Sequence, residues 1–122
     1  MKTSLFLGTL IALLLGSSPA WAHPPDSIAV SYDSTRMLNI EVHHAVKGDI
    51  TKHYIGQIVV ALNDQEVIRQ DFKSQTDKDW QQVVYTVIDL KPGDKVKVTA
   101  NCSVFGTYSQ TFEPLPAAGG GK

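Results

Sequence analysis

The segment HAVKGDITKHYIGQIVV, residues 44–60, contains the end of one strand, a polar loop and the apolar start of a second strand. The β-branched residues of its second half favour extended structure, and Gly48 and Asp49 are typical of a turn. His44 and His53 stand at the two ends of the loop. Packing of two core strands does not require an imidazole at each end of the loop that joins them. The pair therefore suggests a metal ion bound between neighbouring strands.

The rest of the chain repeats this pattern of short strands and turns, with no long stretch of helical periodicity. This spacing predicts an all-β fold, an immunoglobulin-like β-sandwich of about seven strands. The predicted strands are residues 27–32, 37–46, 53–62, 66–72, 80–88, 95–103 and 107–112.

Two of the connections carry specific turn chemistry. Residues 63–65, Asn-Asp-Gln, predict a hairpin-like turn, because Asn and Asp tolerate the left-handed conformation. Residues 91–94, Lys-Pro-Gly-Asp, predict a type II turn, in which Gly93 supplies the positive φ of the second central position. Both turns join predicted strands and support the all-β assignment.

The N-terminus has the features of a secretory signal peptide. Lys2 precedes an apolar run over residues 5–15, and Ala20-Trp21-Ala22 places small residues at the expected cleavage positions. The apolar run is shorter than the roughly 20 residues that a membrane-spanning helix needs. We therefore expect residues 1–22 to be removed, leaving a periplasmic or secreted protein without a membrane anchor that begins at His23.

The remaining residues suit one domain, which we place at 23–113, followed by a disordered Ala/Gly/Pro-rich tail at 114–122. Residues 23–122 carry 10 basic and 12 acidic side chains, because Lys2 is the one charged residue ahead of them. Without a basic cluster, we expect no nucleic-acid partner. The oligomeric state stays open.

Side-chain alternation separates the two adjacent histidines. His44 shares a face with Leu38, Ile40 and Val42 and should point inward, whereas His43 should point to solvent. By the same count Cys102, the single cysteine, points inward near the end of its strand. An imidazole and a thiol are thus expected at one end of the sandwich.

Two interpretations of these residues remain. Imidazole and thiolate together suit iron, copper or zinc rather than calcium or magnesium. Alternatively, His44 and His53 are hydrogen-bonded histidines at strand ends, and Cys102 is a small buried apolar residue or pairs between chains. Short-range metal signatures such as Cys-x-x-Cys are absent.

Three motifs together resemble the iron-binding domain of the desulfoferrodoxin and superoxide reductase family. They are Lys-His-Tyr-Ile at 52–55, Leu-Lys-Pro-Gly-Asp at 90–94 and Asn-Cys-Ser-Val-Phe-Gly at 101–106. The resemblance implies an immunoglobulin-like sandwich with a mononuclear non-haem iron held by four histidines and one cysteine. It also implies reduction of superoxide, or another small oxidant, with electrons from an unknown donor.

The family's ligands can be carried over to four positions. His53 matches the histidine of the family's His-x-Ile motif, and Cys102 matches its cysteine ligand. His44 matches a histidine that the family follows with proline, where this chain has Ala45. His23 matches the first ligand, without the Glu-Lys pair that precedes it in the family. The implied metal ligands are His23, His44, His53 and Cys102.

Phe105 is a departure from the family, because it stands where the family has a further histidine ligand. One hypothesis is therefore an exported iron-binding redox protein with reduced activity. The alternative is a non-catalytic binding or structural module with a vestigial metal site, in which the Phe105 ring fills the place of the missing ligand. No catalytic residue is assigned in either case.

A copper-binding protein is a third possibility, and it depends on the signal peptide. Cleavage after Ala22 would give His23 a free α-amine. The amine and the His23 Nδ1 would chelate one metal ion, and His44 or His53 would complete a three-nitrogen site of the kind that copper favours. A disordered chain end is the alternative.

Overall fold

The computed structural model describes residues 23–116, so the predicted signal peptide at 1–22 and residues 117–122 of the predicted tail lie outside it. Within the described range the chain forms seven strands, as predicted: β1 (Ser27–Tyr32), β2 (Met37–His43), β3 (Ile55–Leu62), β4 (Gln65–Asp71), β5 (Trp80–Thr86), β6 (Val96–Cys102) and β7 (Thr107–Phe112). No helix in this part of the chain is long and apolar enough to cross a bilayer.

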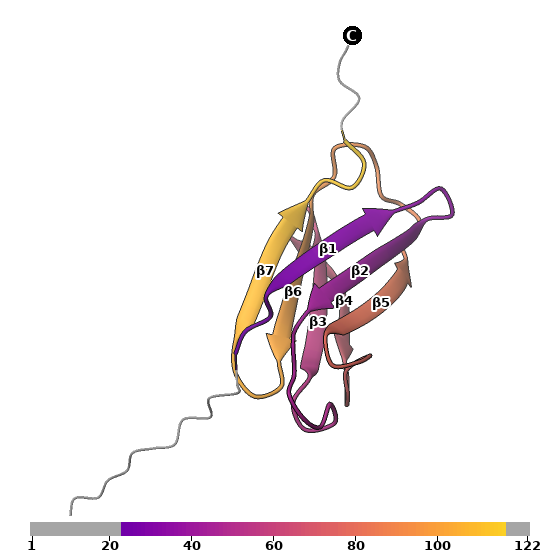
Figure 1. Ribbon diagram of the computed structural model, residues 1–122. Helices are drawn as coiled ribbons and strands as arrows, with labels where there is room; N and C mark the ends of the chain where they lie inside the picture. Colours follow the sequence, from indigo (N-terminus) through magenta and orange to yellow (C-terminus); the bar gives the residue numbers. More distant parts are fainter. Residues whose placement is uncertain (1–22, 117–122) are drawn as a thin grey trace, which may run out of the picture.

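The strands form two antiparallel sheets that pack face to face (Figure 1). One sheet has the order β1-β2-β5, and the other has the order β4-β3-β6-β7. The prediction of an all-β sandwich of seven strands is therefore confirmed.

Several strands are shorter than predicted because their ends pair with loops. The predicted strand 37–46 ends at His43, since the His44 and Val46 amides donate to carbonyls of the β4–β5 loop, at Asp79 and Lys78, over 2.8 and 2.7 Å. The predicted strand 53–62 begins only at Ile55. His44 and His53 thus lie in the connections just beyond the strands rather than within them.

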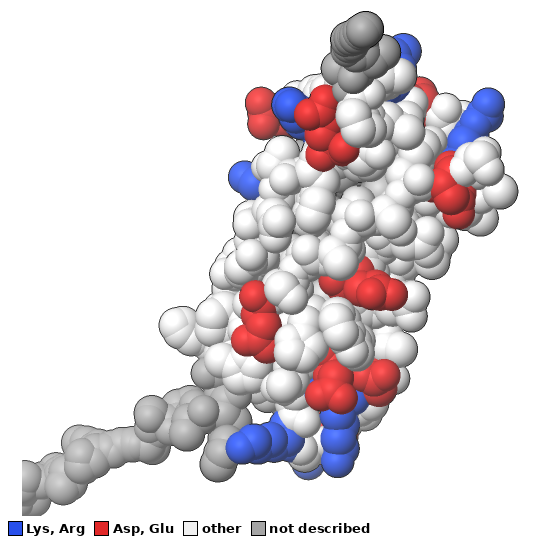
Figure 2. Space-filling model, turned by 45° about the horizontal axis from the view of Figure 1, so that its top comes forward, with Lys and Arg blue, Asp and Glu red and all other residues white. Residues whose placement is uncertain are grey.

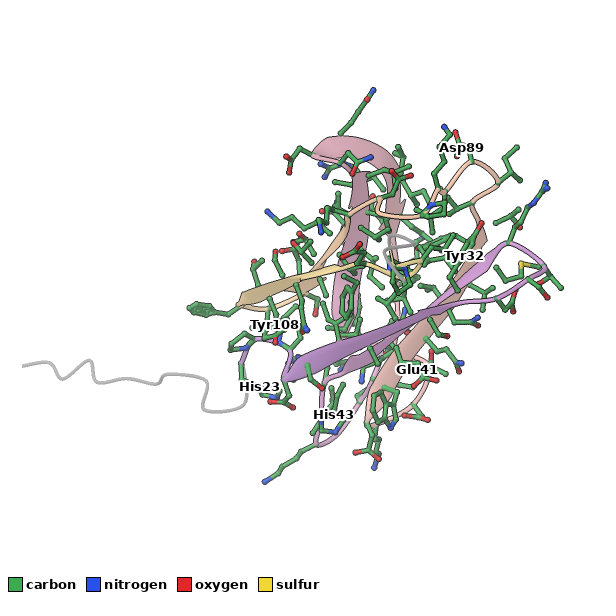
Figure 3. All side chains as sticks on the ribbon, turned by 90° about the horizontal axis from the view of Figure 1, so that it is seen from above. His23, Tyr32, Glu41, His43, Asp89 and Tyr108 are labelled. Atoms are coloured by element: carbon green, nitrogen blue, oxygen red, sulfur yellow. The ribbon has the colours of Figure 1, made fainter. Side chains whose placement is uncertain are left out.

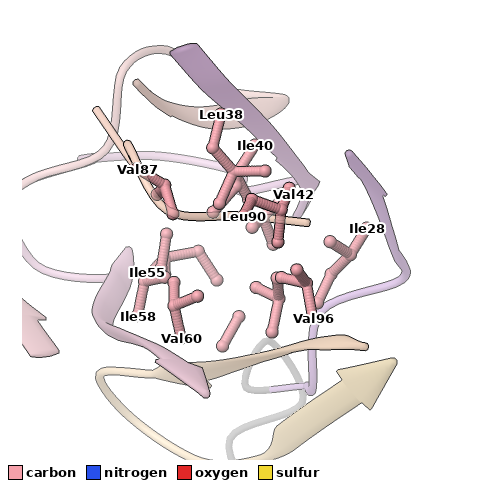
Figure 4. Close-up of a cluster of buried hydrophobic side chains, with 12 residues drawn as sticks. Ile28, Leu38, Ile40, Val42, Ile55, Ile58, Val60, Val87, Leu90 and Val96 are labelled. Carbon is pink, nitrogen blue, oxygen red and sulfur yellow. The ribbon is translucent and has the colours of Figure 1, made fainter. Parts of the chain in front are cut away.

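The core lies between the two sheets and is made of aliphatic side chains (Figure 4). Leu38, Ile40 and Val42 alternate along β2 and face Ile58 and Val60 of β3. All five are at most 1% exposed. The full cluster comprises Ile28, Leu38, Ile40, Val42, Ile55, Ile58, Val60, Val87, Leu90, Val96, Val98 and Ala100. This alternation determines which side chains of β2 point into the core. It also determines that His44, the residue directly after β2, points inward.

Both predicted turns are present. Asn63 and Asp64 have φ values of 50° and 71°, which gives the two-residue β3–β4 hairpin its left-handed turn. Gly93 has φ 90°, and the Asp94 amide donates to the Lys91 carbonyl over 3.0 Å, as a type II turn requires.

Four connections and strand ends meet at one end of the sandwich (Figure 1). The segment before β1 lies beside the end of β2, where the Asp26 amide donates to the His43 carbonyl over 2.8 Å. The start of β3 lies beside the end of β6, where Ile55 pairs with Cys102. Antiparallel pairing within each sheet, together with the connection from β2 to β3, therefore brings residues near 23, 44, 53 and 102 to the same end of the sandwich.

A β-bulge holds the start of β3 against β6. The register shifts between Ile55 and Gln57, and a Cβ added at Gly56 would lie 3.3 Å from the Ser103 Cα. Beyond the bulge, the Ser103 amide donates to the Tyr54 carbonyl over 2.8 Å, and the Tyr54 amide donates to the Ser103 Oγ over 3.1 Å. These bonds fix the backbone next to His53.

Candidate metal centre

Three imidazoles gather at this end of the sandwich. One ring nitrogen of each of His23, His44 and His53 lies within 4.8 Å of the corresponding nitrogens of the other two. The ring centroids are 4.7 Å apart for His23 and His44, 4.9 Å for His44 and His53, and 5.4 Å for His23 and His53. In Figure 3, His23 lies on the opposite side of the view from Asp89, which belongs to a distant loop.

His44 is completely buried, as the alternation of β2 predicted. Its Nδ1 lies 2.8 Å from the Oε1 of Gln75, and its Nε2 lies 3.3 Å from the His23 carbonyl oxygen. Burial lowers the pKa of His44 below its ordinary value, against the opposing effect of the Gln75 hydrogen bond. A buried neutral imidazole is the form that binds a metal.

His53 follows a turn that Asp49 stabilises. The Asp49 Oδ1 accepts hydrogen bonds from the Thr51 amide and hydroxyl, and the Asp49 carbonyl accepts from the His53 amide over 3.2 Å. Within residues 23–116, the Nε2 of His53 is the one buried side-chain nitrogen or oxygen without a hydrogen-bond partner. Desolvation, and then the neighbouring His44 and His23, lower the pKa of His53. An unpartnered buried nitrogen is costly unless something binds it.

His23 reaches the cluster from the segment before β1. Its Nδ1 lies 2.9 Å from the Pro24 carbonyl oxygen and its Nε2 lies 2.8 Å from the Ala45 carbonyl oxygen. A neutral imidazole has one N–H and can donate to only one of these carbonyls. Metal binding through either nitrogen would therefore replace one of the two contacts.

Cys102 lies at the same end of the sandwich as the three histidines, but its thiol is not one of the closely spaced atoms of the cluster. It is partly buried at the end of β6, opposite Ile55, and its Sγ accepts a hydrogen bond from the Val104 amide over 3.4 Å. The structure thus brings together three of the four predicted ligands and leaves the fourth on an adjacent strand end.

Two neighbouring side chains point away from the cluster. Phe105 is 61% exposed, so the hypothesis that its ring fills the place of a missing ligand is wrong. His43 points outward as predicted, where its Nδ1 lies 3.3 Å from an Asp26 carboxylate oxygen and its ring centroid lies 4.8 Å from that of Trp80, with the two rings tilted by 54°. Neither residue belongs to the candidate site.

A surface pocket borders His53. Its volume is about 320 Å³, and it is lined by Lys47, Asp49, Lys52 and His53. The face of the molecule in Figure 2 carries Asp and Glu side chains over its middle, while Lys and Arg side chains lie mainly toward its edges and ends. The pocket is large enough for a small molecule and has two lysines on its lining.

The residues present fit a metal ion. Metal–imidazole bonds are about 2.0–2.1 Å long, so two coordinated nitrogens lie at most about 4.2 Å apart. The 4.8 Å limit of the cluster is slightly larger, and small movements of the rings would bring the nitrogens into range. The neutral ring of His44 and the unpartnered His53 Nε2 have the state that ligation needs.

Comparisons with known proteins give one informative match. No protein-family model matches the chain, and no curated protein matches it. Among solved structures, the chain is similar to the superoxide reductase (1Fe-SOR) from Giardia intestinalis, with a TM-score of 0.58 and 18% sequence identity. The match covers 74% of this chain and 98% of the other. At this identity the likeness shows a shared fold.

Sequence reasoning missed two parts of the site. Gln75 lies in a polar segment that looks like an ordinary solvated loop, yet it is 3% exposed and contacts His44. Gly106 was noted as part of a motif, but its close approach to Pro24 depends on a contact between the two ends of the chain. No local pattern signals either contact.

Proposed function

We propose that this chain is an exported, mononuclear metal-binding redox protein of the superoxide reductase type, with His23, His44 and His53 as ligands. The observation that carries the proposal is the buried, unpartnered Nε2 of His53 beside two other imidazoles. Non-haem iron is the metal that the fold similarity supports. Bound iron would supply one-electron redox chemistry, with superoxide or another small oxidant as substrate.

Cys102 is the fourth proposed ligand. It lies partly buried opposite Ile55, at the same end of the sandwich as the histidines, and its Sγ accepts a hydrogen bond from the Val104 amide over 3.4 Å. A thiolate ligand increases the electron density on a metal. The departure from the family at Phe105 leaves one imidazole fewer, and we therefore propose reduced activity.

The pocket beside His53 is the proposed route for the small oxidant. Lys47 and Lys52 on its lining would attract an anion such as superoxide, while Asp49 keeps its carboxylate engaged with Thr51. The electron donor is a separate partner that the fold does not specify. Nucleic acid is not a proposed partner, since the charged side chains of the chain are nearly balanced.

The test is the metal content of the protein purified from the exported fraction, together with its visible spectrum after anaerobic iron loading. We expect close to one iron per chain and a thiolate-to-iron absorption band that disappears in Cys102→Ala. His53→Leu should lose the iron, while His43→Leu, an outward histidine next to the site, should keep it. A colourless, metal-free protein under both conditions would overturn the proposal.

A non-catalytic module with a vestigial site is the competing function, and the contacts of His23 favour it. Both ring nitrogens of His23 lie within hydrogen-bond distance of carbonyl oxygens, so the ring has polar partners within the chain without a metal. In that case His53→Leu would change stability alone. Equal metal content in wild type and His53→Leu would favour this module.

Copper is the alternative metal, because three imidazoles without a carboxylate also suit copper. If residues 1–22 are removed, the His23 α-amine and Nδ1 can chelate one ion together. The chain beginning at His23 should then bind Cu(II) much more tightly than a chain with one additional residue ahead of His23. Equal affinities would return His23 to the role of a simple imidazole ligand.

A further inference from the structure

Gln75 is a buried residue of the β4–β5 loop whose amide contacts four groups. Its Oε1 lies 2.8 Å from the His44 Nδ1 and accepts from the Ile55 amide over 3.1 Å. Its Nε2 donates to the His44 carbonyl over 2.8 Å and to the Asp77 carbonyl over 2.9 Å. The side chain is therefore fully hydrogen-bonded between the end of β2, the start of β3 and its own loop.

The three backbone partners determine which way the amide points. The Ile55 N–H needs an acceptor, and the two carbonyl oxygens need donors. The reversed amide would place its NH₂ group against an N–H and its oxygen against two carbonyl oxygens. The Oε1 must therefore face the Nδ1 of His44.

The position of Oε1 determines the tautomer of His44. Because Oε1 is an acceptor, the Nδ1 at 2.8 Å carries the proton in the neutral ring, and the Nε2 keeps its lone pair. In the other tautomer, Nε2 would carry the proton and donate to the His23 carbonyl over 3.3 Å. The unprotonated Nδ1 would then face Oε1, so that two acceptors would meet without a proton between them. The shorter bond and the fixed amide both favour the Nδ1–H form.

We propose that Gln75 is a positioning residue that holds His44 as its Nδ1–H tautomer and so presents Nε2 to a metal ion. The consequence for metal binding rests on the proposed function, whereas the tautomer does not. Groups that hydrogen-bond the second nitrogen of a ligating histidine fix its orientation, and their loss typically weakens metal binding about 10- to 100-fold.

The direct test is the tautomer of His44 in the metal-free protein, measured by NMR of ¹⁵N-labelled imidazoles at a pH where the rings are neutral. Wild type should show an unprotonated Nε2. Gln75→Leu removes the acceptor, and the signal of the Nδ1–H form should be lost. Gln75→Glu keeps an oxygen facing Nδ1 and the Ile55 amide, so the Nδ1–H form should persist although two carbonyls lose their donor.

Gln81→Leu is the matched control. Gln81 is a second glutamine with 3% exposure, and its Oε1 accepts from the Thr76 amide over 2.8 Å without touching His44. Gln81→Leu should leave the Nδ1–H tautomer of His44 unchanged even if the variant is less stable. Retention of the Nδ1–H form in Gln75→Leu, or its loss in Gln81→Leu, would overturn the proposal.

Titration with Zn(II) alone supplies the second measurement. Gln75→Leu should bind zinc about 10- to 100-fold more weakly than wild type, while Gln81→Leu should bind as wild type does. Equal zinc affinity in Gln75→Leu and wild type would contradict the consequence for metal binding. If wild type binds neither zinc nor iron, the proposed function fails, and the NMR result still decides the role of Gln75.

Discussion

Gly106 lies directly against Pro24: a Cβ at position 106 would come within 2.6 Å of the Pro24 Cα and backbone nitrogen. This contact joins the loop between β6 and β7 to the segment that carries His23. Since Gly106 also has φ +109°, it combines a conformation that favours glycine with a close backbone approach. The position of His23 near the N-terminus therefore depends on packing against Gly106 near the C-terminus.

Gly106→Ala should displace His23 and weaken metal binding. The new methyl group cannot fit beside Pro24, so the segment before β1 must move away from the loop. Gly48→Ala is a matched control, because Gly48 has φ +114° and nothing within 4 Å of an added Cβ. Both variants should lose roughly 1–3 kcal/mol from backbone strain.

The measurements are urea unfolding and metal titration of the two glycine variants. Only Gly106→Ala should show weaker metal binding. Gly48→Ala should lower the free energy of unfolding and leave metal binding unchanged. If the two variants bind metal equally well, the contact with Pro24 does not position His23.

The metal-free protein should become less stable as the pH falls through the histidine range. The pKa values of His44 and His53 are lowered from 6.5 in the folded state, mainly by burial. Below about pH 6.5 the unfolded chain therefore binds more protons than the folded chain does. The contribution of the two neutral histidines to the free energy of unfolding is present above about pH 6.5 and is lost as the pH falls toward their lowered folded-state pKa values. The chain should have a higher urea midpoint at about pH 8 than at about pH 5.5.

His53→Leu is the variant that isolates this effect, because leucine keeps the site filled without a titrating group. Its urea midpoint should change less between the two pH values than that of wild type. Carboxylates with lowered pKa values, such as Asp33 and Asp94, titrate below this range and do not interfere. An identical pH dependence in wild type and variant would contradict the assignment to His53.

The fold could be predicted from local patterns, whereas the site could be predicted only in part. Alternation along residues 38–44 was enough to place His44 inside and His43 outside, because side-chain direction in a strand has a period of two. The start of β3 was predicted two residues too early. The strand ending at β2 was predicted three residues too long at its end, because the pairing of His44 with the β4–β5 loop is a tertiary contact. Gln75 was missed for the same reason.

Ile58 should be among the residues that contribute most to stability. It is completely buried between the sheets in the middle of β3, so Ile58→Ala leaves a cavity that the surrounding side chains fill only in part. We expect a loss of about 2–5 kcal/mol in the free energy of unfolding. Val84→Ala, at a position 49% exposed, should change it by no more than about 0.5 kcal/mol. Similar losses in both variants would contradict the position of the core.

Phe105→His tests whether one substitution can supply the further histidine ligand that the sequence resemblance implies at this position. Phe105 is 61% exposed. Two contacts hold its loop: the Cys102 amide donates to the Gly106 carbonyl over 2.8 Å, and Gly106 packs against Pro24. A histidine at this position should therefore point to solvent. We expect a change in stability of at most about 0.5 kcal/mol and no gain in iron affinity. A large gain in affinity would show that metal binding turns the loop toward His23, and the exposed conformation of residue 105 would then belong to the metal-free protein alone.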